Sequence, residues 1–389
     1  MKRAVHAAVL LGMMVATACS RKLLVGVVLP ETGEAAVYGA SIKSGLKVAF
    51  DEAAAARTAP EGLQVEYRDS ASEPAQAASA LEALYDDGAL IVIGGVTSVE
   101  ANAMLPVAEK WERVLLSPSA SAPDLAKRSV YFFRVFPSDD LEGVKAADLL
   151  ALTRNARTAL IVQEDNTYSR GLLPVFMGEY ENQGGRVVGS VRTADAGWDR
   201  QTREVLSTQQ PAAVYICGYG DAIIEALRIV RSTGFAGTIC TTSAINTSTL
   251  LQRAGRLAEG VFLPLAGFDA ASQQEPIRTF VARYRNVYNL TPDIYAAHGY
   301  DAALVCLYAL EGLRTRAGSE VQVRMKGLNE KRGVTGPLAF DDYGNIKHYP
   351  RSHWIRGGKV EDYDAYLERE KDHGRQQLGG LHLENGGAA

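Results

Sequence analysis

The sequence feature that most constrains the fold is a repeated alternation of short apolar runs with longer amphipathic stretches, which begins at Leu23. The run 24–30 is almost continuously apolar, as in a strand buried on both faces, and 40–56 carries apolar residues at helical spacing. Further strands are expected at 63–68, 89–93 and 114–116, and helices at 75–85 and 99–111. Because strands that alternate with helices form a parallel sheet covered on both faces, the sequence predicts an α/β fold.

A second block of the same kind follows a strand expected at 130–135. Its strands are expected at 159–162, 186–191 and 214–217, its helices at 141–152, 172–183, 201–208 and 222–233, and two more helices follow at 277–288 and 294–313. Two similar blocks in a chain of 389 residues predict two similar lobes, each with its own sheet; the resemblance given below implies that these lobes are Rossmann-like. We expect one lobe to comprise 23–136 and 267–349, the other 137–266 and 350–366, and the polar, glycine-rich tail 367–389 to be disordered.

The N-terminus has the pattern of an export signal. Lys2 and Arg3 precede a short apolar segment, and the small residues Ala16-Thr17-Ala18 precede Cys19. Small residues before a cysteine resemble a lipoprotein processing site, so we expect a signal peptide at 1–18 and a lipid anchor on Cys19. The alternative is ordinary signal peptidase, which would cut the same bond and leave a free thiol. Either way the mature protein is exported to the periplasm, and any membrane attachment is through the lipid.

Composition excludes some partners. The net charge is −4, and no basic run exists outside the extreme N-terminus, so no nucleic-acid partner is expected. Cys217 and Cys240 end two strands that should be neighbours, and export permits a disulfide between them. The alternative, which we favour, is that both are buried free thiols, as is Cys306.

Polar loops follow the expected strands. In open parallel sheets, ligands bind at the carboxyl ends of the strands. The first block offers glycines and hydroxyl groups there, at 37–39, 94–98 and 117–121, whereas the second offers tyrosines and acids, at 164–168, 217–221 and 241–246. Together these loops predict a polar cleft between the lobes.

The serine-rich stretch 117–121 has the pattern of a helix start. Ser121 stands as a potential N-cap, with Pro123 in the first turn and Asp124 three residues on. Free N–H groups and serine hydroxyls at the positive end of a helix form a seat for a carboxylate. The alternative is an ordinary capped loop between a strand and a helix.

No catalytic constellation is present. The sequence lacks a nucleophile elbow, a phosphate-binding loop and a dinucleotide-binding glycine pattern, and its six histidines show no metal-ligand spacing. We expect no catalytic residue, no metal and no cofactor. A cleft of hydroxyls and tyrosines indicates reversible binding.

Three segments resemble the type I periplasmic substrate-binding proteins, specifically the leucine/isoleucine/valine-binding branch. They are VGVVLP at 25–30 with Tyr38-Gly39, LSPSA at 116–120, and GVTGPLAFD at 333–341 with Gly344. The resemblance covers roughly 23–366. It implies two lobes joined by three crossovers, which close over a small ligand and deliver it to an ABC permease. We expect a monomer.

The resemblance also implies roles for individual residues. Ser98, Ser119, Ala120 and Ser121 would hold the ligand carboxylate, and Tyr38, Tyr168 and Tyr219 would line and shut the cleft. Within the family an acid commonly receives the ligand ammonium in the loop where this chain has Ser243. A serine cannot supply that charge.

Two readings of the Ser243 departure are open. A neighbouring acid replaces the charge, Asp221 before Glu164 or Asp165, and the ligand is a branched-chain or other small amino acid. Otherwise the ligand is a keto acid or an aromatic acid without the ammonium. A ligand sensor without a transport role and a two-lobe enzyme are the remaining alternatives.

Overall fold

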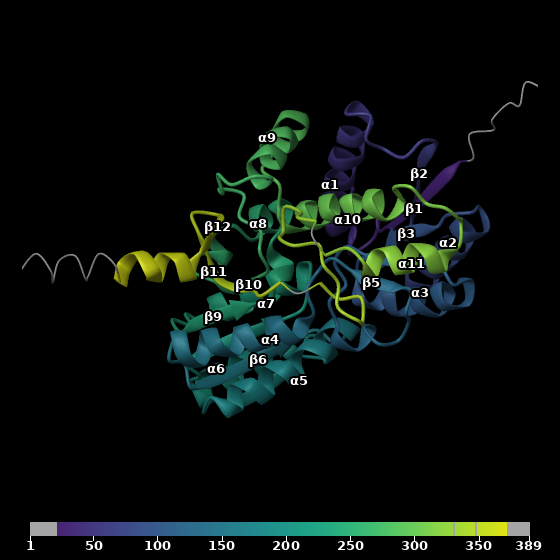
Figure 1. The fold of residues 1–389 in the computed structure, drawn as a ribbon. Coiled ribbons are helices and arrows are strands. Elements are labelled where there is room, and N and C mark those ends of the chain that lie inside the picture. The colour runs from purple at the N-terminus through teal and green to yellow at the C-terminus, as the bar shows by residue number, and fades with distance from the viewer. Residues whose placement is uncertain (1–21, 330, 347, 372–389) are drawn as a thin grey trace, which may run out of the picture.

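The first sheet is built from short apolar strands. The computed structural model describes residues 22–329, 331–346 and 348–371, and Figure 1 shows its fold. β1 (Leu23–Leu29) is buried along its whole length and lies between β2 (Leu63–Asp69) and β3 (Ile91–Gly94). β4 (Val114–Ser117) and β5 (Phe132–Arg134) complete a parallel sheet in the order β2-β1-β3-β4-β5.

Helices cover both faces of this sheet because successive strand residues point to opposite sides. Leu24 and Val28 pack on one side against α2 (Pro74–Asp86) and α3 (Ser98–Trp111). Val25 and Val27 pack on the other side against α1 (Ala36–Ala55) and α10 (Ile294–Leu310). The close approach of these two helices requires Gly45, since a Cβ there would lie 1.9 Å from the carbonyl oxygen of Ala296.

The second sheet has seven strands in the order β12-β11-β10-β9-β8-β6-β7. Its parallel part consists of β6 (Thr158–Gln163), β7 (Arg186–Arg192), β8 (Ala213–Cys217), β9 (Thr238–Thr241) and β10 (Phe262–Leu265). The antiparallel strands β11 (Arg351–Arg356) and β12 (Lys359–Asp362) extend it at the β10 edge. The neighbouring strands β8 and β9 carry Cys217 and Cys240, and these two thiols and Cys306 are buried and free.

Helices also cover both faces of the second sheet. α4 (Asp139–Asp148) and α5 (Thr167–Asn182) pack together over one face. α6 (Trp198–Gln209), α7 (Asp221–Ser232) and the short α8 (Ser248–Ala254) contribute to the core on the other. The α/β architecture predicted from the alternating pattern is therefore confirmed.

Three crossovers join the two lobes. The chain passes from β5 to α4, then from β10 to α9 (Ile277–Tyr288), which packs with α10 against α1. After α11 (Gly318–Lys326), Asn345 pairs with Arg134, and the chain crosses a third time to enter β11. Figure 1 shows the β1–β4 region on the right and β6 with α4 to α6 at the lower left.

The disordered C-terminal tail was expected to begin at residue 367, but the chain remains helical beyond that position. Residues 363–371 form a helix, so 367–371 are ordered, contrary to the expectation for 367–389. The physical reason is that Tyr363, Tyr366 and Leu367 share one helical face and pack near Phe262 and Trp354. The remainder of the predicted tail, the signal peptide and Cys19 lie outside the described residues.

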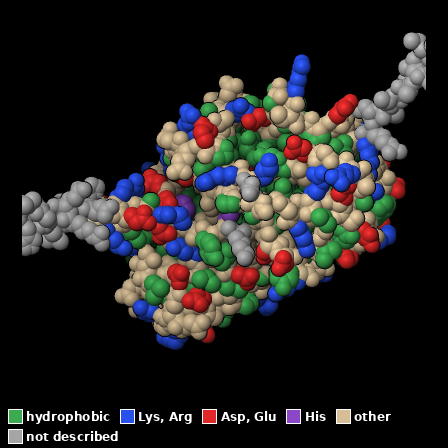
Figure 2. All heavy atoms as spheres, in the orientation of Figure 1, with side chains coloured by type: hydrophobic (Ala, Val, Ile, Leu, Met, Phe, Trp, Pro, Cys, Tyr) green, Lys and Arg blue, Asp and Glu red, His purple; other side chains and the backbone are tan. Residues whose placement is uncertain are grey.

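The surface carries mixed charge. Figure 2 shows basic and acidic side chains interspersed over the visible face. Within the described residues, no helix has the length and apolar character needed to cross a membrane.

Candidate ligand-binding site

A small cavity lies between the two lobes, at the carboxyl ends of their strands. First-lobe loops contribute hydroxyl groups to the wall, and second-lobe loops contribute tyrosines and Ser243. The lining residues are Tyr38, Val96, Thr97, Ser98, Ser119, Ser121, Phe136, Tyr168, Tyr219, Ser243, Ala244 and Tyr295.

Tyr38 spans the cleft. Its hydroxyl donates a hydrogen bond to the carbonyl oxygen of Ala244 (3.0 Å) and accepts one from the N–H of Gly220 (2.7 Å). Tyr38 belongs to α1 in the first lobe, whereas both partners lie in loops of the second lobe. The structure therefore has the closed arrangement of the lobes.

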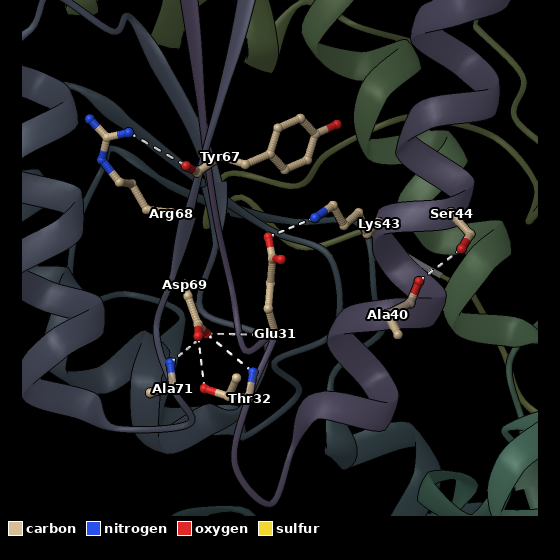
Figure 3. Close-up of polar contacts among 9 residues, drawn as sticks. All are labelled: Glu31, Thr32, Ala40, Lys43, Ser44, Tyr67, Arg68, Asp69 and Ala71. Carbon is tan, nitrogen blue, oxygen red and sulfur yellow. Dashed lines mark hydrogen bonds and ion pairs between the residues drawn. The ribbon is translucent and has the colours of Figure 1, made fainter.

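Asp69 fixes the loop that leads to Tyr38. Its carboxylate accepts hydrogen bonds from the N–H groups of Glu31 (2.8 Å) and Ala71 (2.7 Å) and from the Thr32 hydroxyl (2.7 Å). Figure 3 shows these donors converging on Asp69 at the end of β2. The first turn of α1, which carries Tyr38, is thereby attached to the rim of the sheet.

The serine-rich stretch does not begin an α-helix, contrary to expectation. Pro123–Leu125 forms a single 3-10 turn after Ala122, and the chain is extended again at Ala126, so Ser121 is not its N-cap. Proline and aspartate favour both kinds of turn, and only a continuing helix would produce a useful dipole. The carboxylate-binding site predicted at this turn therefore lacks the helix dipole that was expected to favour an anion.

The hydroxyls of this stretch differ in how they are used. Ser119 donates its proton to the carbonyl oxygen of Val96 (2.6 Å), and the N–H of Ala120 donates to the Ser117 hydroxyl (2.9 Å). Ala120 does not line the cavity, whereas Ser121 does. The Ser121 hydroxyl faces the buried carboxyl of Asp139 as well as the cavity.

A true helix N-terminus faces the cavity one loop earlier. α3 starts at Ser98, and Thr97 caps it through a capping box with Glu100. The first N–H groups of a helix have no partner within the helix, and its positive end favours an anion. The Ser98 hydroxyl accepts a hydrogen bond from the N–H of Ala122 (3.2 Å), which leaves its own proton free to donate. This end of α3 supplies the seat that the 3-10 turn lacks.

Aromatic rings form the apolar part of the wall. Tyr38 lies 4.8 Å from Tyr295 and 6.3 Å from Tyr219, between ring centroids, and Tyr295 stacks on Phe136 at 6.0 Å. Tyr168 completes the set, 6.4 Å from Tyr219. Phe136 and Tyr295 were not predicted as site residues, because the first resembles a crossover residue and the second an ordinary core position at a helix start.

The three acids expected to replace the charge missing at Ser243 do not line the cavity. Asp221 is exposed and forms an ion pair with Arg253 (2.7 Å), because the first turn of α7 presents it toward α8. Glu164 accepts a hydrogen bond from the N–H of Tyr219 (3.1 Å), and Asp165 pairs with Arg170 (2.7 Å).

Two other carboxylates lie behind the cavity wall, in the first turn of α4. Glu142 accepts hydrogen bonds from the N–H (2.8 Å) and hydroxyl (2.8 Å) of Ser243 and from the Tyr168 hydroxyl (3.3 Å). Asp139 is fully buried, and neither of its carboxylate oxygens has a hydrogen-bond partner of good geometry among the described residues.

The two carboxyls influence each other. Burial raises the pKa of Glu142 to about 7, although the donors of Ser243 and Tyr168 oppose the rise. Burial, and then the nearby Glu142, raise the pKa of Asp139 well above its ordinary value. The sequence signal for this pair was the spacing of two acids in the first turn after the crossover, which usually marks exposed partners of the helix dipole.

Comparison with known proteins identifies the family. A family model described as periplasmic binding protein matches residues 22–350. The chain belongs to the periplasmic binding protein family.

Among curated proteins, this periplasmic binding protein is similar to the leucine-, isoleucine-, valine-, threonine-, and alanine-binding protein of Pseudomonas aeruginosa. The two are 24% identical over 327 residues, which cover 82% of this chain and 86% of the relative. The Leu/Ile/Val-binding protein BraC3 of Rhizobium johnstonii is 31% identical over 202 residues, 51% of this chain and 54% of that one.

Solved structures of the same fold include a leucine binding protein, LivK, from Thermotoga maritima. It has a TM-score of 0.81 and 25% identity, and the match covers 87% of this chain and 97% of that one. A solute binding protein from R. palustris in complex with benzoate has a TM-score of 0.78 and 18% identity, covering 88% and 95% of the two chains, which shows the fold alone.

The structure of this periplasmic binding protein brings together most residues predicted for its cleft. Tyr38, Ser98, Ser119, Ser121, Tyr168, Tyr219 and Ser243 line the cavity. Ala120 and Asp221 do not line the cavity. The N–H of Ala120 donates to the Ser117 hydroxyl within its own turn, and the exposed side chain of Asp221 pairs with Arg253.

Proposed function

We propose that this protein is the extracytoplasmic binding component of an ABC importer and that its closed cleft holds a branched-chain or other small amino acid. The observation that carries the proposal is the cavity between the lobes, across which Tyr38 of the first lobe bonds to two loops of the second. Further support comes from the names of its relatives, which bind leucine, isoleucine and valine.

In this proposal the ligand carboxylate lies at the N-terminus of α3. The N–H of Ser98 and the hydroxyls of Ser98 and Ser121 donate to it, and the dipole of α3 adds to their effect. The aromatic rings of Tyr38, Tyr219 and Tyr295 enclose the apolar side chain of the ligand.

The lobes would move as units. We propose that 23–136 with 267–349 and 137–266 with 350–366 rotate about the crossovers, and that ligand binding stabilises the closed form. The closed protein would then dock on a permease as a monomer, held at the membrane by lipid on Cys19.

A thermal-shift screen of the purified protein tests the proposal. The panel contains amino acids, aromatic acids, small amides and other carboxylates, because a ligand that binds only the folded state raises the melting temperature. We expect an amino acid to give the largest shift and to be recovered unchanged by mass spectrometry. A panel without any shift would contradict the proposal, and chemical turnover of the ligand would instead indicate an enzyme.

A second candidate is an aromatic or keto acid. The observation that favours it is the aromatic wall combined with a serine at position 243. The fold is also that of a protein solved with benzoate. A larger shift with benzoate or a keto acid than with every amino acid would select this candidate.

A ligand sensor would bind in the same way without a transport role. Deletion of the gene separates the two, since loss of uptake of the radiolabelled ligand indicates transport. Unchanged uptake with an altered transcriptional response to the ligand would indicate sensing.

A further inference from the structure

We propose that Glu142 and Asp139 together bind the ammonium group of an α-amino acid ligand. This inference rests on the proposed function and specifies its substrate class. None of the described residues that line the cavity is acidic, so these two acids of α4 would supply the carboxylates that an ammonium group needs.

The three donors to Glu142 place it directly behind the cavity wall, although it does not line the cavity itself. They belong to Ser243 and Tyr168, and both residues line the cavity wall. Glu142 therefore lies one hydrogen bond behind the space that a ligand would occupy. An ionised carboxylate has about four acceptor sites, so the three donors leave capacity for one more.

Asp139 supplies the independent observation. Its side chain is fully buried, and both carboxylate oxygens lack a hydrogen-bond partner of good geometry among the described residues. The carboxyl faces the hydroxyl of Ser121, which lines the cavity. A buried carboxyl with only one facing hydroxyl is costly, and an incoming group with several N–H donors would satisfy it.

No ion pair within 4.0 Å joins Glu142 or Asp139 to a basic residue among the described residues. The buried guanidinium of Arg134 acts on Asp139 electrostatically, but its hydrogen bonds go to Asn345 (2.7 Å) and to the carbonyl oxygen of Ala122 (2.9 Å). The pair therefore has acceptor capacity and no ion-paired partner, and a ligand cation would supply one.

The position of Ser121 points to an α-amino acid. Its carbonyl oxygen accepts a hydrogen bond from the N–H of Asp139 (2.9 Å), and the next residue, Ala122, bonds to Ser98 at the start of α3. Ser121 thus lies between the carboxylate seat and the acid pair. Because Ser121 takes part in both sites, the two sites suit a ligand whose carboxylate and ammonium groups are attached to the same carbon atom.

Calorimetric titration of the full mature chain tests this inference with pairs of ligands. Leucine, alanine and phenylalanine are each compared with their deaminated keto acids, which keep the carboxylate and the side chain. In the wild type we expect the amino acid of the best pair to bind more tightly than its keto acid.

The Glu142→Gln variant should weaken binding of that amino acid by about 30-fold or more and leave the keto acid within about threefold. Asp140→Asn is the matched control, because Asp140 lies in the same turn but is exposed, and it should change neither affinity. The melting temperature of each ligand-free variant confirms that it folds.

A double variant tests the placement of the charge. Ser243 contacts Glu142 and lines the cavity, so Ser243→Asp combined with Glu142→Gln returns one carboxylate to the same place. We expect this double variant to recover at least tenfold of the lost amino-acid affinity.

The possible outcomes distinguish failure of this inference from failure of the proposed function. Equal loss for both ligands in Glu142→Gln, or no loss for the amino acid, would overturn the inference and leave the proposed function standing. Tighter binding of keto acids than of amino acids by the wild type would overturn the inference too. Glu142 and Asp139 would then be protonated and would donate hydrogen bonds to the ligand. If no ligand of the panel binds the wild type, the proposed function fails and the inference fails with it.

Discussion

The hydroxyl of Tyr38 and the carbonyl oxygen of Ala244, 206 positions apart in the chain, form a 3.0 Å hydrogen bond across the cleft. The same hydroxyl accepts from the N–H of Gly220, so one side chain of the first lobe joins two loops of the second. Both bonds depend on the lobes being closed. Ligand affinity and lobe closure should therefore respond together to changes at this position.

Replacement of Tyr38 by phenylalanine should weaken ligand binding by about 1–2 kcal/mol. The variant loses both cross-cleft hydrogen bonds, each worth about 1 kcal/mol, but keeps the ring and its packing. Calorimetric titration gives the affinity, and scattering with saturating ligand gives the degree of closure. Tyr67→Phe is a suitable control, since Tyr67 lies on β2, away from the cavity. An unchanged affinity in Tyr38→Phe would show that these bonds do not hold the lobes together.

Ser121→Ala should weaken binding of a carboxylate ligand by about 1–3 kcal/mol, because a charged group would lose a buried donor. Ser119→Ala is the matched control and should have a smaller effect, since Ser119 donates its proton to Val96. The structure removes a helix cap as an explanation for Ser121. Its hydroxyl still faces the buried carboxyl of Asp139, so the melting temperature of the ligand-free variant is measured beside the affinity. A lower melting temperature with intact affinity would instead give Ser121 a structural role.

The stability of the ligand-free protein should carry a pH signature from Glu142. Its pKa is about 7 in the folded protein, against 4.5 ordinarily. Between these values the folded state binds more protons than the unfolded state, so the contribution of Glu142 to the free energy of unfolding falls as pH rises. Glutamine does not titrate. The free energy of unfolding of Glu142→Gln, relative to wild type, should therefore increase by on the order of 2–3 kcal/mol from pH 5 to pH 8.

Denaturant unfolding at several pH values measures this difference. A difference that stays flat across the window would mean that Glu142 titrates normally. The titratable and charged groups around Glu142 and Asp139 are Asp140, Arg134, Tyr168, Tyr215, Cys217, Cys240 and Tyr295. Burial raises the pKa of the tyrosines and thiols in this set, so they stay neutral over this range.

Lipidation of Cys19 is a separate prediction. The wild-type protein expressed in a bacterial host should fractionate with membranes, and its intact mass should correspond to a chain that begins at Cys19 and carries acyl groups. Cys19→Ala should abolish the added mass, whereas Ser20→Ala, at the following residue, should retain it. A free Cys19 on a soluble periplasmic protein would support ordinary signal peptidase.

Most of the fold could be predicted because buried parallel strands and their helices have strong local patterns. The run around Val25 and Val27 is apolar on both faces, which only a covered sheet explains. The antiparallel strands at 351–356 and 359–362 were missed, since exposed charged residues alternate there with buried ones at an edge. The helix at 363–371 was missed because its aromatic face has meaning only against Phe262 and Trp354.

The site was harder to predict because its key contacts join distant segments. Local capping rules gave Ser121 a helix that ends after one 3-10 turn. From the sequence, Asp221 was selected as an acid near a helix start, and Glu142 was not singled out. Only the packing of α4 against the second sheet buries Glu142 under Ser243, while Asp221 remains in solvent.

Arg134 has a mechanical consequence. Its backbone N–H and its side chain both bind the segment Gly344-Asn345, so the first and third crossovers leave the first lobe from one shared anchor. Two connectors held at one point should move together, so we expect the first lobe to rotate about this anchor when the cleft opens.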